Sequence, residues 1–217
     1  MNSSLPFENR RKAGQALAQR LAEYGSETLV FALPRGGVPV AVEVAQALDA
    51  ELDVFVVRKL GAPGQPELAL GAVASSGVQV LNDALISRIG VSEAELEKVA
   101  EGERQELQRR EQLYRGERAA PNIKGRTVVL VDDGLATGAS MRAAVAAVRQ
   151  AEPAKLVVAV PVAAPDTCEA LSEEVDKVVC VATPTPFYGV GRWYTDFRQV
   201  TDDEVRALLE PSPGKLT

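Results

Sequence analysis

The stretch at residues 128–140, VVLVDDGLATGAS, constrains the fold of this chain more than any other. Four branched apolar residues in a row cannot present one wet face, so residues 128–131 predict a strand buried on both faces of a parallel sheet. Asp132 and Asp133 follow where that strand ends, and small and hydroxyl residues then lead to an Ala-rich helical run that begins at Met141. The turn should therefore offer free backbone N–H groups at a helix N-terminus, an arrangement that binds anions.

The two acids beside this turn narrow the choice of anion. They would repel a bare phosphate, whereas a phosphorylated sugar offers a phosphate to the turn and vicinal hydroxyls or a bound divalent cation to the carboxylates. The thirteen residues resemble the phosphoribosyl pyrophosphate (PRPP) signature of type I phosphoribosyltransferases, in which four apolar residues and two acids precede a small-residue turn with Thr-Gly and a hydroxyl. An ordinary strand-turn-helix of a doubly wound domain is the alternative.

The resemblance implies a role for each part of the signature. Asp132 and Asp133 would be the catalytic acids that hold the ribose hydroxyls, and Asp132 would support Mg²⁺, directly or through water. The magnesium ion would keep mostly water and ligand oxygens, so no cage of protein ligands is expected. The 5′-phosphate would be bound by the residues of the turn, which are Ala136, Thr137, Gly138, Ala139 and Ser140.

A second anion loop follows the strand expected at residues 28–33. Arg35, Gly36 and Gly37 lie between that strand and an Ala/Val helix that extends to Leu48. The glycines would let backbone N–H groups approach a ligand, and the arginine can fork onto phosphate oxygens. The segment resembles the RGG form of the family's pyrophosphate loop, although a tight turn alone would also explain the two glycines.

Two adjacent cations, Arg58 and Lys59, follow the strand expected at residues 51–57. At the end of a parallel strand they would face the ligand crevice and balance the charge of a pyrophosphate, while solvated surface charge is the alternative. A Gly/Pro-rich loop at 61–67 and a hairpin of residues 68–74 and 78–81 come next. Their position resembles that of the family's mobile catalytic loop.

The acid that would face the acceptor base is less defined. Ala136 stands before the Thr-Gly where 6-oxopurine phosphoribosyltransferases carry an Asp. This ATG form resembles adenine phosphoribosyltransferases, whose acid on the base side comes from the mobile loop. That likeness makes Glu67 a candidate catalytic residue.

The tail at residues 183–197 concentrates aromatic side chains in a Gly/Pro-rich segment. It resembles the base-binding hood of the 6-oxopurine enzymes, with Phe187, Val190-Gly191 and Asp196 at the matching positions and one extra residue between Gly191 and Asp196. Phe187 and Trp193 offer flat faces on which a base can stack, but the same rings could equally plug the end of a core.

Strands and helices alternate along the chain. Further apolar strands are expected at 155–162 and 177–181, and the pattern predicts an α/β fold with a doubly wound parallel sheet of about five strands, whose ligand crevice lies beyond their carboxyl ends. We expect a single phosphoribosyltransferase domain over all 217 residues. Its parts would be a core at about 26–182, a helical insertion at about 83–119 and a small C-terminal hood at about 183–200.

The expected insertion contains a long charged helix. Ser92 and Glu95 form a capping box that opens it, and it should run to about Arg118. Because charges of both signs alternate along it, it should lie against the domain or a dimer mate rather than against nucleic acid. Thr201 and Glu204 should cap the last helix in the same way.

The composition excludes several classes of function. A net charge of −6 disfavours a surface for duplex nucleic acid, and the chain contains no histidine. Cys168 and Cys180 have no metal-ligand spacing, which fits a reducing cytosol. The longest apolar run, 156–164, is interrupted by Pro161 and too short to span a membrane, and the N-terminus has no apolar leader, so a cytoplasmic protein is expected.

The resemblance as a whole implies a Mg²⁺-dependent glycosyltransferase of nucleotide salvage. It would move the phosphoribosyl group of PRPP onto a nitrogenous base, expected to be a purine, and release pyrophosphate. A non-catalytic PRPP or nucleotide sensor is the main alternative, because Ala136 and the register of the hood depart from the 6-oxopurine pattern. A sugar-phosphate hydrolase that uses Asp132 as nucleophile or base is the third.

Overall fold

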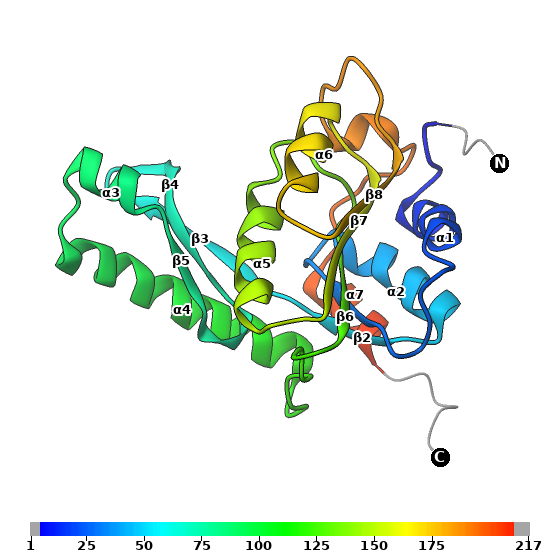
Figure 1. Cartoon of the computed structure of the whole chain (residues 1–217), viewed down its shortest axis with the longest axis horizontal. Helices are drawn as coiled ribbons and strands as arrows, with labels where there is room; N and C mark the ends of the chain where they lie inside the picture. The colour runs from blue at the N-terminus through cyan, green and yellow to red at the C-terminus, as the bar shows by residue number, and fades with distance from the viewer. Residues whose placement is uncertain (1–4, 211–217) are drawn as a thin grey trace.

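The computed structural model describes residues 5–210, apart from the side chains of residues 66, 67 and 76. At its centre is a five-stranded parallel sheet with the strand order β2-β1-β6-β7-β8 (Figure 1). This arrangement confirms the predicted doubly wound α/β fold. The strands are β1 (Leu29–Ala32), β2 (Glu51–Val54), β6 (Thr127–Val131), β7 (Lys155–Val162) and β8 (Lys177–Ala182).

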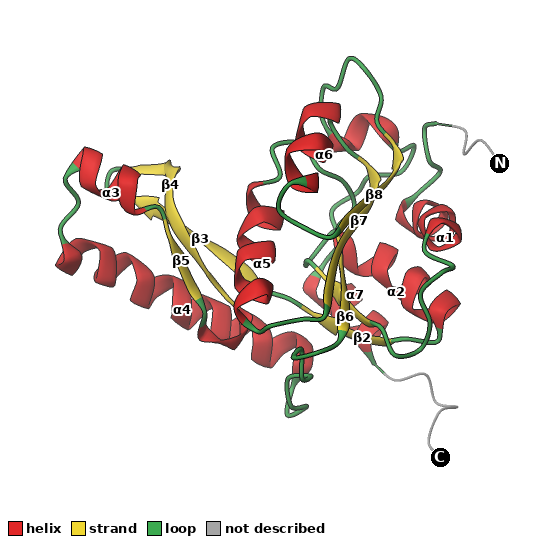
Figure 2. Ribbon diagram, in the orientation of Figure 1, coloured by secondary structure: helices red, strands yellow, loops and turns green. Residues whose placement is uncertain are grey.

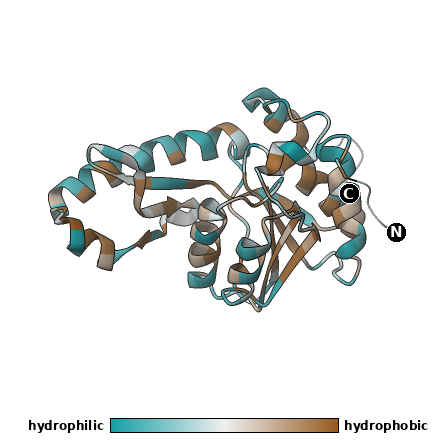
Figure 3. Ribbon diagram, turned by 90° about the horizontal axis from the view of Figure 1, so that it is seen from above, coloured by the Kyte–Doolittle hydropathy of each residue, from teal (hydrophilic) through white to brown (hydrophobic). Residues whose placement is uncertain are grey.

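Helices cover both faces of this sheet (Figure 2). On one face lie α1 (Arg10–Arg20) and α2 (Gly37–Leu48), and on the other lie α5 (Ala139–Gln150) and α6 (Pro165–Ser172). The short helix α7 (Asp202–Leu209) contacts α2 and the long helix α4 (Glu93–Arg115). The central strands are hydrophobic, while the helices carry hydrophilic residues on their outer sides (Figure 3).

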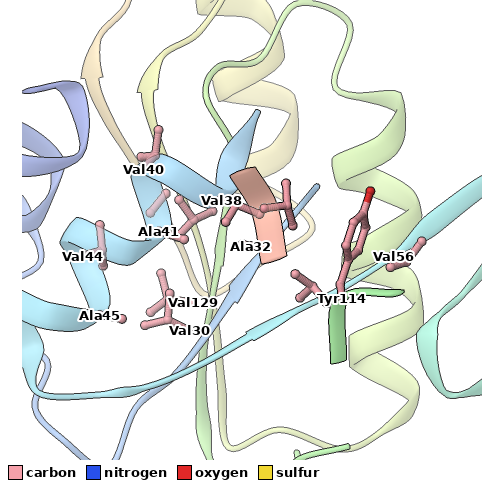
Figure 4. Close-up of a cluster of buried hydrophobic side chains, with 14 of the residues drawn as sticks. Val30, Ala32, Val38, Val40, Ala41, Val44, Ala45, Val56, Tyr114 and Val129 are labelled. Carbon is pink, nitrogen blue, oxygen red and sulfur yellow. The ribbon is translucent and has the colours of Figure 1, made fainter. Parts of the chain in front are cut away.

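The signature strand β6 is buried on both faces, as its sequence predicts. Val129 packs with Val30 and the apolar side of α2 in one cluster (Figure 4), whereas Val128 and Leu130 pack with α5 in another. None of these side chains has exposed surface. Since full burial of a side chain of this size contributes about 1.5–3 kcal/mol, the two clusters hold β6 and the acids that follow it in one place.

A second, antiparallel sheet has the order β3-β4-β5. Its strands, β3 (Val57–Ala62), β4 (Gln65–Ala74) and β5 (Gln79–Leu81), contact α4 and α5. A 3-10 turn, η1 (Ser75–Gly77), joins β4 to β5, and α3 (Asp83–Ile89) leads into α4. The pairing of β4 with β5 confirms the predicted hairpin.

Two predictions for this region are wrong. The strand predicted at 51–57 is interrupted, because the chain leaves the parallel sheet after Val54 and starts β3 in the other sheet at Val57. The loop predicted at 61–67 is mostly strand, because β3 and β4 pair around a tight turn at Pro63 and Gly64. No long loop is present there.

The helix ends follow local chemistry. Both predicted capping boxes are present, at the start of α4 and at the start of α7. α4 ends at Arg115, three residues before the predicted end. There Arg115 donates to Asp53 of β2 at 2.8 Å in a buried ion pair, which attaches α4 to the central sheet.

The hood at residues 183–200 contains the short 3-10 helix η2 (Val190–Trp193). A β-bridge between Phe7 and Tyr194 ties the segment before α1 to the hood. On the neighbouring edge of the sheet, Cys168 of α6 and Cys180 of β8 form a disulfide that their spacing did not predict. No helix within residues 5–210 is long and apolar enough to cross a bilayer.

Candidate functional site

The candidate site lies where the sheet changes winding direction. After β1 the chain leads into α2 on one face, and after the adjacent strand β6 it leads into α5 on the other face. Such a switch point opens a crevice beyond the carboxyl ends of the two strands. The loop at residues 34–37 and the signature turn at 132–140 both end there, and the N–H of Leu33 donates to the carbonyl of Val131 at 2.9 Å.

The signature turn encloses a cavity of about 200 Å³. Its N-cap, Gly138, has a φ of +72° and gives no side-chain cap, so the first N–H groups of α5 are left for another acceptor. Thr167 of α6 supports the turn by donating its hydroxyl to the carbonyl of Ala136 at 2.6 Å. The cavity is lined by Asp132, Val190 and the residues 134–141, which include all five predicted phosphate-binding residues.

The two signature acids point to different places. Asp132 lines the cavity, and its Oδ1 accepts the N–H of Asp133 at 2.8 Å. Burial, together with the neighbouring Asp133 charge, raises the pKa of Asp132 well above its usual range. Asp133 instead accepts a bond from Nε of Arg10 at 2.8 Å, with side chains only 10% and 14% exposed for Arg10 and Asp133. Burial raises the pKa of Asp133, and the Arg10 charge opposes that rise.

The two glycines of the RGG loop are required by close contacts with Asp133 and with the backbone at the end of β6. A Cβ atom on Gly36 would lie 2.1 Å from Oδ2 of Asp133, and one on Gly37 would lie 2.7 Å from the carbonyl oxygen of Val131. Only glycine permits these approaches without movement of the neighbouring atoms. Arg35 has its Nη1 3.7 Å from Oδ1 of Asp202, at the start of α7.

The predicted place of Arg58 and Lys59 at the end of a parallel strand is wrong, because both residues belong to β3. Arg58 pairs with Glu103 of α4 at 2.7 Å and does not line the cavity of the signature turn. Lys59 lines a cavity of about 400 Å³ between the three-stranded sheet and α5, and Ser140 of the signature turn lines the same cavity. Glu67 lies in β4, and its side chain is outside the described residues.

The hood aromatics pack against one another. Phe187 stacks on Trp193, with ring centres 6.4 Å apart, and both belong to the hydrophobic cluster around Phe7 and Tyr194. None of the three candidate base contacts lines the phosphate cavity, and Asp196 lines a separate small cavity beside Arg10. For the two rings, the structure matches the alternative in which they plug a core.

Two residues of the site were missed by the sequence prediction. They are Arg10 and Tyr194, whose hydroxyl donates to the carbonyl of Asp133 at 2.6 Å. Val190, which the resemblance placed in the hood, is the hood residue at the cavity. Burial raises the pKa of Tyr194, so this hydroxyl keeps its proton. Arg10 has an equally charged neighbour in Arg11, and no sequence pattern separates the two.

The oxygen atoms of the site fit a magnesium ion that takes one ligand from the protein and the others from water and substrate. Within the described residues no three His, Cys, Asp or Glu side chains gather as a metal site. Magnesium commonly uses one or two carboxylates and completes its shell with water and phosphate oxygens. Asp132 at the cavity wall meets that requirement.

Comparison with known proteins agrees with this geometry. Residues 7–191 match the family model described as "Phosphoribosyl transferase domain". Two proteins from the CDC 1551 and H37Rv strains of Mycobacterium tuberculosis, each named "Putative phosphoribosyl transferase", are 47% identical over 205 residues, or 94% of this chain and 46% of each relative. The chain thus spans about half the length of the curated relatives it matches.

Two solved structures share the fold. The crystal structure of TT1426 from Thermus thermophilus is 48% identical, with a TM-score of 0.85 over 94% of this chain and 98% of that chain. A hypothetical protein from Neisseria gonorrhoeae with bound ppGpp is 13% identical, with a TM-score of 0.50 over 97% of each chain. At that identity the likeness concerns the fold alone.

Proposed function

Because the chain belongs to the phosphoribosyl transferase family, we propose that it binds PRPP with Mg²⁺ and transfers the phosphoribosyl group to a nitrogenous base. The observation that carries this proposal is the meeting of three elements at one switch point. The uncapped turn of α5 and the carboxylate of Asp132 line one cavity, and the RGG loop lies directly against Asp132 and Asp133 at the ends of the adjacent strands β1 and β6. A 5′-phosphate, vicinal hydroxyls and a pyrophosphate are the matching groups on one small molecule.

Each group of the chain would have a simple task. The first N–H groups of α5, with the hydroxyls of Thr137 and Ser140, would hold the 5′-phosphate. Asp132 would accept hydrogen bonds from the ribose hydroxyls and orient the sugar. Arg35 would leave Asp202 to meet the pyrophosphate, to which it can donate two parallel bonds.

The chemistry then needs positioning and charge neutralisation more than covalent help. The bond from the anomeric carbon to pyrophosphate breaks with both electrons going to pyrophosphate, a bond to a ring nitrogen of the base forms, and that nitrogen gives its proton to water. The carbon carries positive charge as pyrophosphate departs, so a nearby carboxylate and the exclusion of water favour the transfer. Bound Mg²⁺ would neutralise charge on the leaving group.

A purine is the proposed acceptor. The proposal is supported by the ATG form of the turn and by the hood, both of which resemble purine enzymes, and by Val190, which brings an apolar side chain of the hood to the cavity. Since the aromatic rings pack in the hood core, stacking by Phe187 or Trp193 no longer supports this choice.

The test is to incubate the protein with PRPP and Mg²⁺ against a panel of purines, orotate and uracil, and to identify nucleotide products by mass. We expect a nucleotide product with a purine, none when base or Mg²⁺ is omitted, and a reduced rate at limiting PRPP when Asp132→Asn replaces the wild type. Release of pyrophosphate without any base would instead indicate a hydrolase. Binding of PRPP with no product from any base would indicate a sensor.

A further inference from the structure

A buried arginine at the start of α1 joins three distant segments of the chain. Arg10 is only 9% exposed. Its Nε donates to Oδ2 of Asp133 at 2.8 Å, its Nη1 donates to the carbonyl of Arg198 at 2.8 Å, and its guanidinium carbon lies 3.9 Å from the ring centre of Phe197. Because a buried charge is tolerated only when it is paired and hydrogen-bonded, these contacts define one geometry for Arg10.

The carboxylate that Arg10 holds is also the support of the RGG loop. Oδ2 of Asp133 accepts the Arg10 bond and is the same atom that a Cβ on Gly36 would approach to 2.1 Å. Asp133 therefore lies between the arginine and the loop backbone. A change in its position has to move Gly36 and the residues attached to it, because the packed interior offers no empty space for the displaced oxygen.

The other side of Asp133 is held by the hood. Tyr194 donates its hydroxyl to the Asp133 carbonyl at 2.6 Å. Tyr194 itself is tied to the segment before α1, since the N–H of Phe7 donates to the carbonyl of Trp193 and the N–H of Thr195 donates to the carbonyl of Phe7, both at 2.8 Å. Arg10 and Phe7 thus belong to one short segment. Through Arg10 this segment holds the side chain of Asp133, and through Phe7 and Tyr194 it holds the backbone carbonyl of Asp133.

The phosphate turn has supports of its own. The first turn of α5 and the hydroxyl of Thr167 on α6 hold it from the face of the sheet opposite α1, while the hood reaches it through the side chain of Val190. The two ends of the crevice therefore differ in how closely they are tied to Arg10. Loss of Arg10 should disturb the loop end more than the turn end.

We propose that Arg10 is a positioning residue that acts through Asp133 to hold the RGG loop where it receives the pyrophosphate group of PRPP. The inference rests on the proposed function. It assigns Asp133 to the support of the loop and leaves Asp132 as the acid that meets the ribose. Arg10 itself touches no part of the substrate.

The test compares two ligands that differ only in the pyrophosphate. Calorimetric titrations of PRPP with Mg²⁺ and of ribose 5-phosphate are made on wild type, Arg10→Gln and Arg11→Gln. Arg11 is the matched control, because it is the next residue and also donates its Nε to a carboxylate at 2.8 Å, that of Glu43, while its side chain is 73% exposed. We expect Arg10→Gln to weaken PRPP about tenfold or more and to change ribose 5-phosphate less than about twofold. The Arg11 variant should match wild type for both ligands.

Two further variants test whether Arg10 acts through Asp133 and provide a comparison if Arg10→Gln does not fold. If Arg10 acts through Asp133, the double variant Arg10→Gln/Asp133→Asn should bind PRPP no more weakly than the worse single variant. Arg10→Lys keeps a cation beside Asp133 and should fall between wild type and Arg10→Gln, and it carries the comparison if the glutamine variant does not fold. Equal losses for both ligands, an unchanged PRPP affinity, or additive losses in the double variant would overturn the inference. Wild-type protein that binds neither ligand would instead refute the proposed function itself.

Discussion

Replacing the two signature acids one at a time should change the stability of the fold to different extents. Asp133→Asn removes the negative partner of Arg10 from a pair whose side chains are 14% and 10% exposed. Asp132→Asn removes a carboxylate that has no ion-pair partner within the described residues and whose pKa is raised by burial and by Asp133. We therefore expect the first variant to be destabilised, and the second to be as stable as wild type or slightly more stable.

The size of the difference follows from the contacts. Removing one partner of a buried ion pair costs about 3–5 kcal/mol, and the uncharged asparagine oxygen can still accept a hydrogen bond from Arg10 worth about 1 kcal/mol. The free energy of unfolding of Asp133→Asn should thus fall by about 2–4 kcal/mol. For a chain of this length that lowers Tm by roughly 4–16 °C. Asp132→Asn should instead weaken PRPP binding by about 1–3 kcal/mol, because it loses charge-assisted bonds to the ribose.

The assay combines urea unfolding of both variants with calorimetric titration of PRPP. If both substitutions lowered the free energy of unfolding equally, the assignment of Asp133 to structural support and of Asp132 to ribose binding would be refuted. So would a stable Asp133→Asn protein, because the Arg10 pair would then contribute nothing to the fold.

Three further predictions concern the turn and the hood. Ribose 5-phosphate should raise Tm and ribose should not, because the first N–H groups of α5 bind the phosphate; equal shifts from both sugars would contradict this in a thermal melt. Thr167→Val should weaken ribose 5-phosphate roughly fivefold in calorimetry, because the bond to the carbonyl of Ala136 is lost, and unchanged affinity would show that the turn needs no support from α6. The hydrogen bond from Arg198 lowers the pKa of Glu204 to about 2, so its contribution to stability is complete above its ordinary pKa and is lost as pH falls toward 2. The Tm difference between wild type and Glu204→Gln should therefore be largest near neutral pH and disappear near pH 2, whereas a constant difference would rule out this ionisation.

The sequence predicted the parts of the fold that depend on local pattern. Branched residues at 128–131 identify β6 because only a doubly covered strand can bury them all. Ser92 with Glu95, and Thr201 with Glu204, locate two helix starts because a capping box needs only neighbours in the chain. The five strands and their common crevice follow from that pattern and from the handedness of their connections.

Predictions that depend on partners far along the chain were less successful. Arg58 was placed in the crevice because its strand was expected to be parallel, but the chain changes sheets between Val54 and Val57, and Glu103 lies 45 residues away. Arg10 lies 123 residues from Asp133, and nothing in its own neighbourhood distinguishes it from Arg11. Which acid of a pair is free, and which is already held, depends on such distant contacts.

A structure of the protein crystallised with PRPP and Mg²⁺ would show directly whether the crevice between β1 and β6 binds PRPP. We expect density for the 5′-phosphate at the first turn of α5, for the ribose hydroxyls at Asp132, and for the pyrophosphate at the loop of Arg35, Gly36 and Gly37, with Asp133 still paired to Arg10. Density for PRPP outside the crevice between β1 and β6, or a ribose bound by Asp133 with Arg10 displaced, would contradict it.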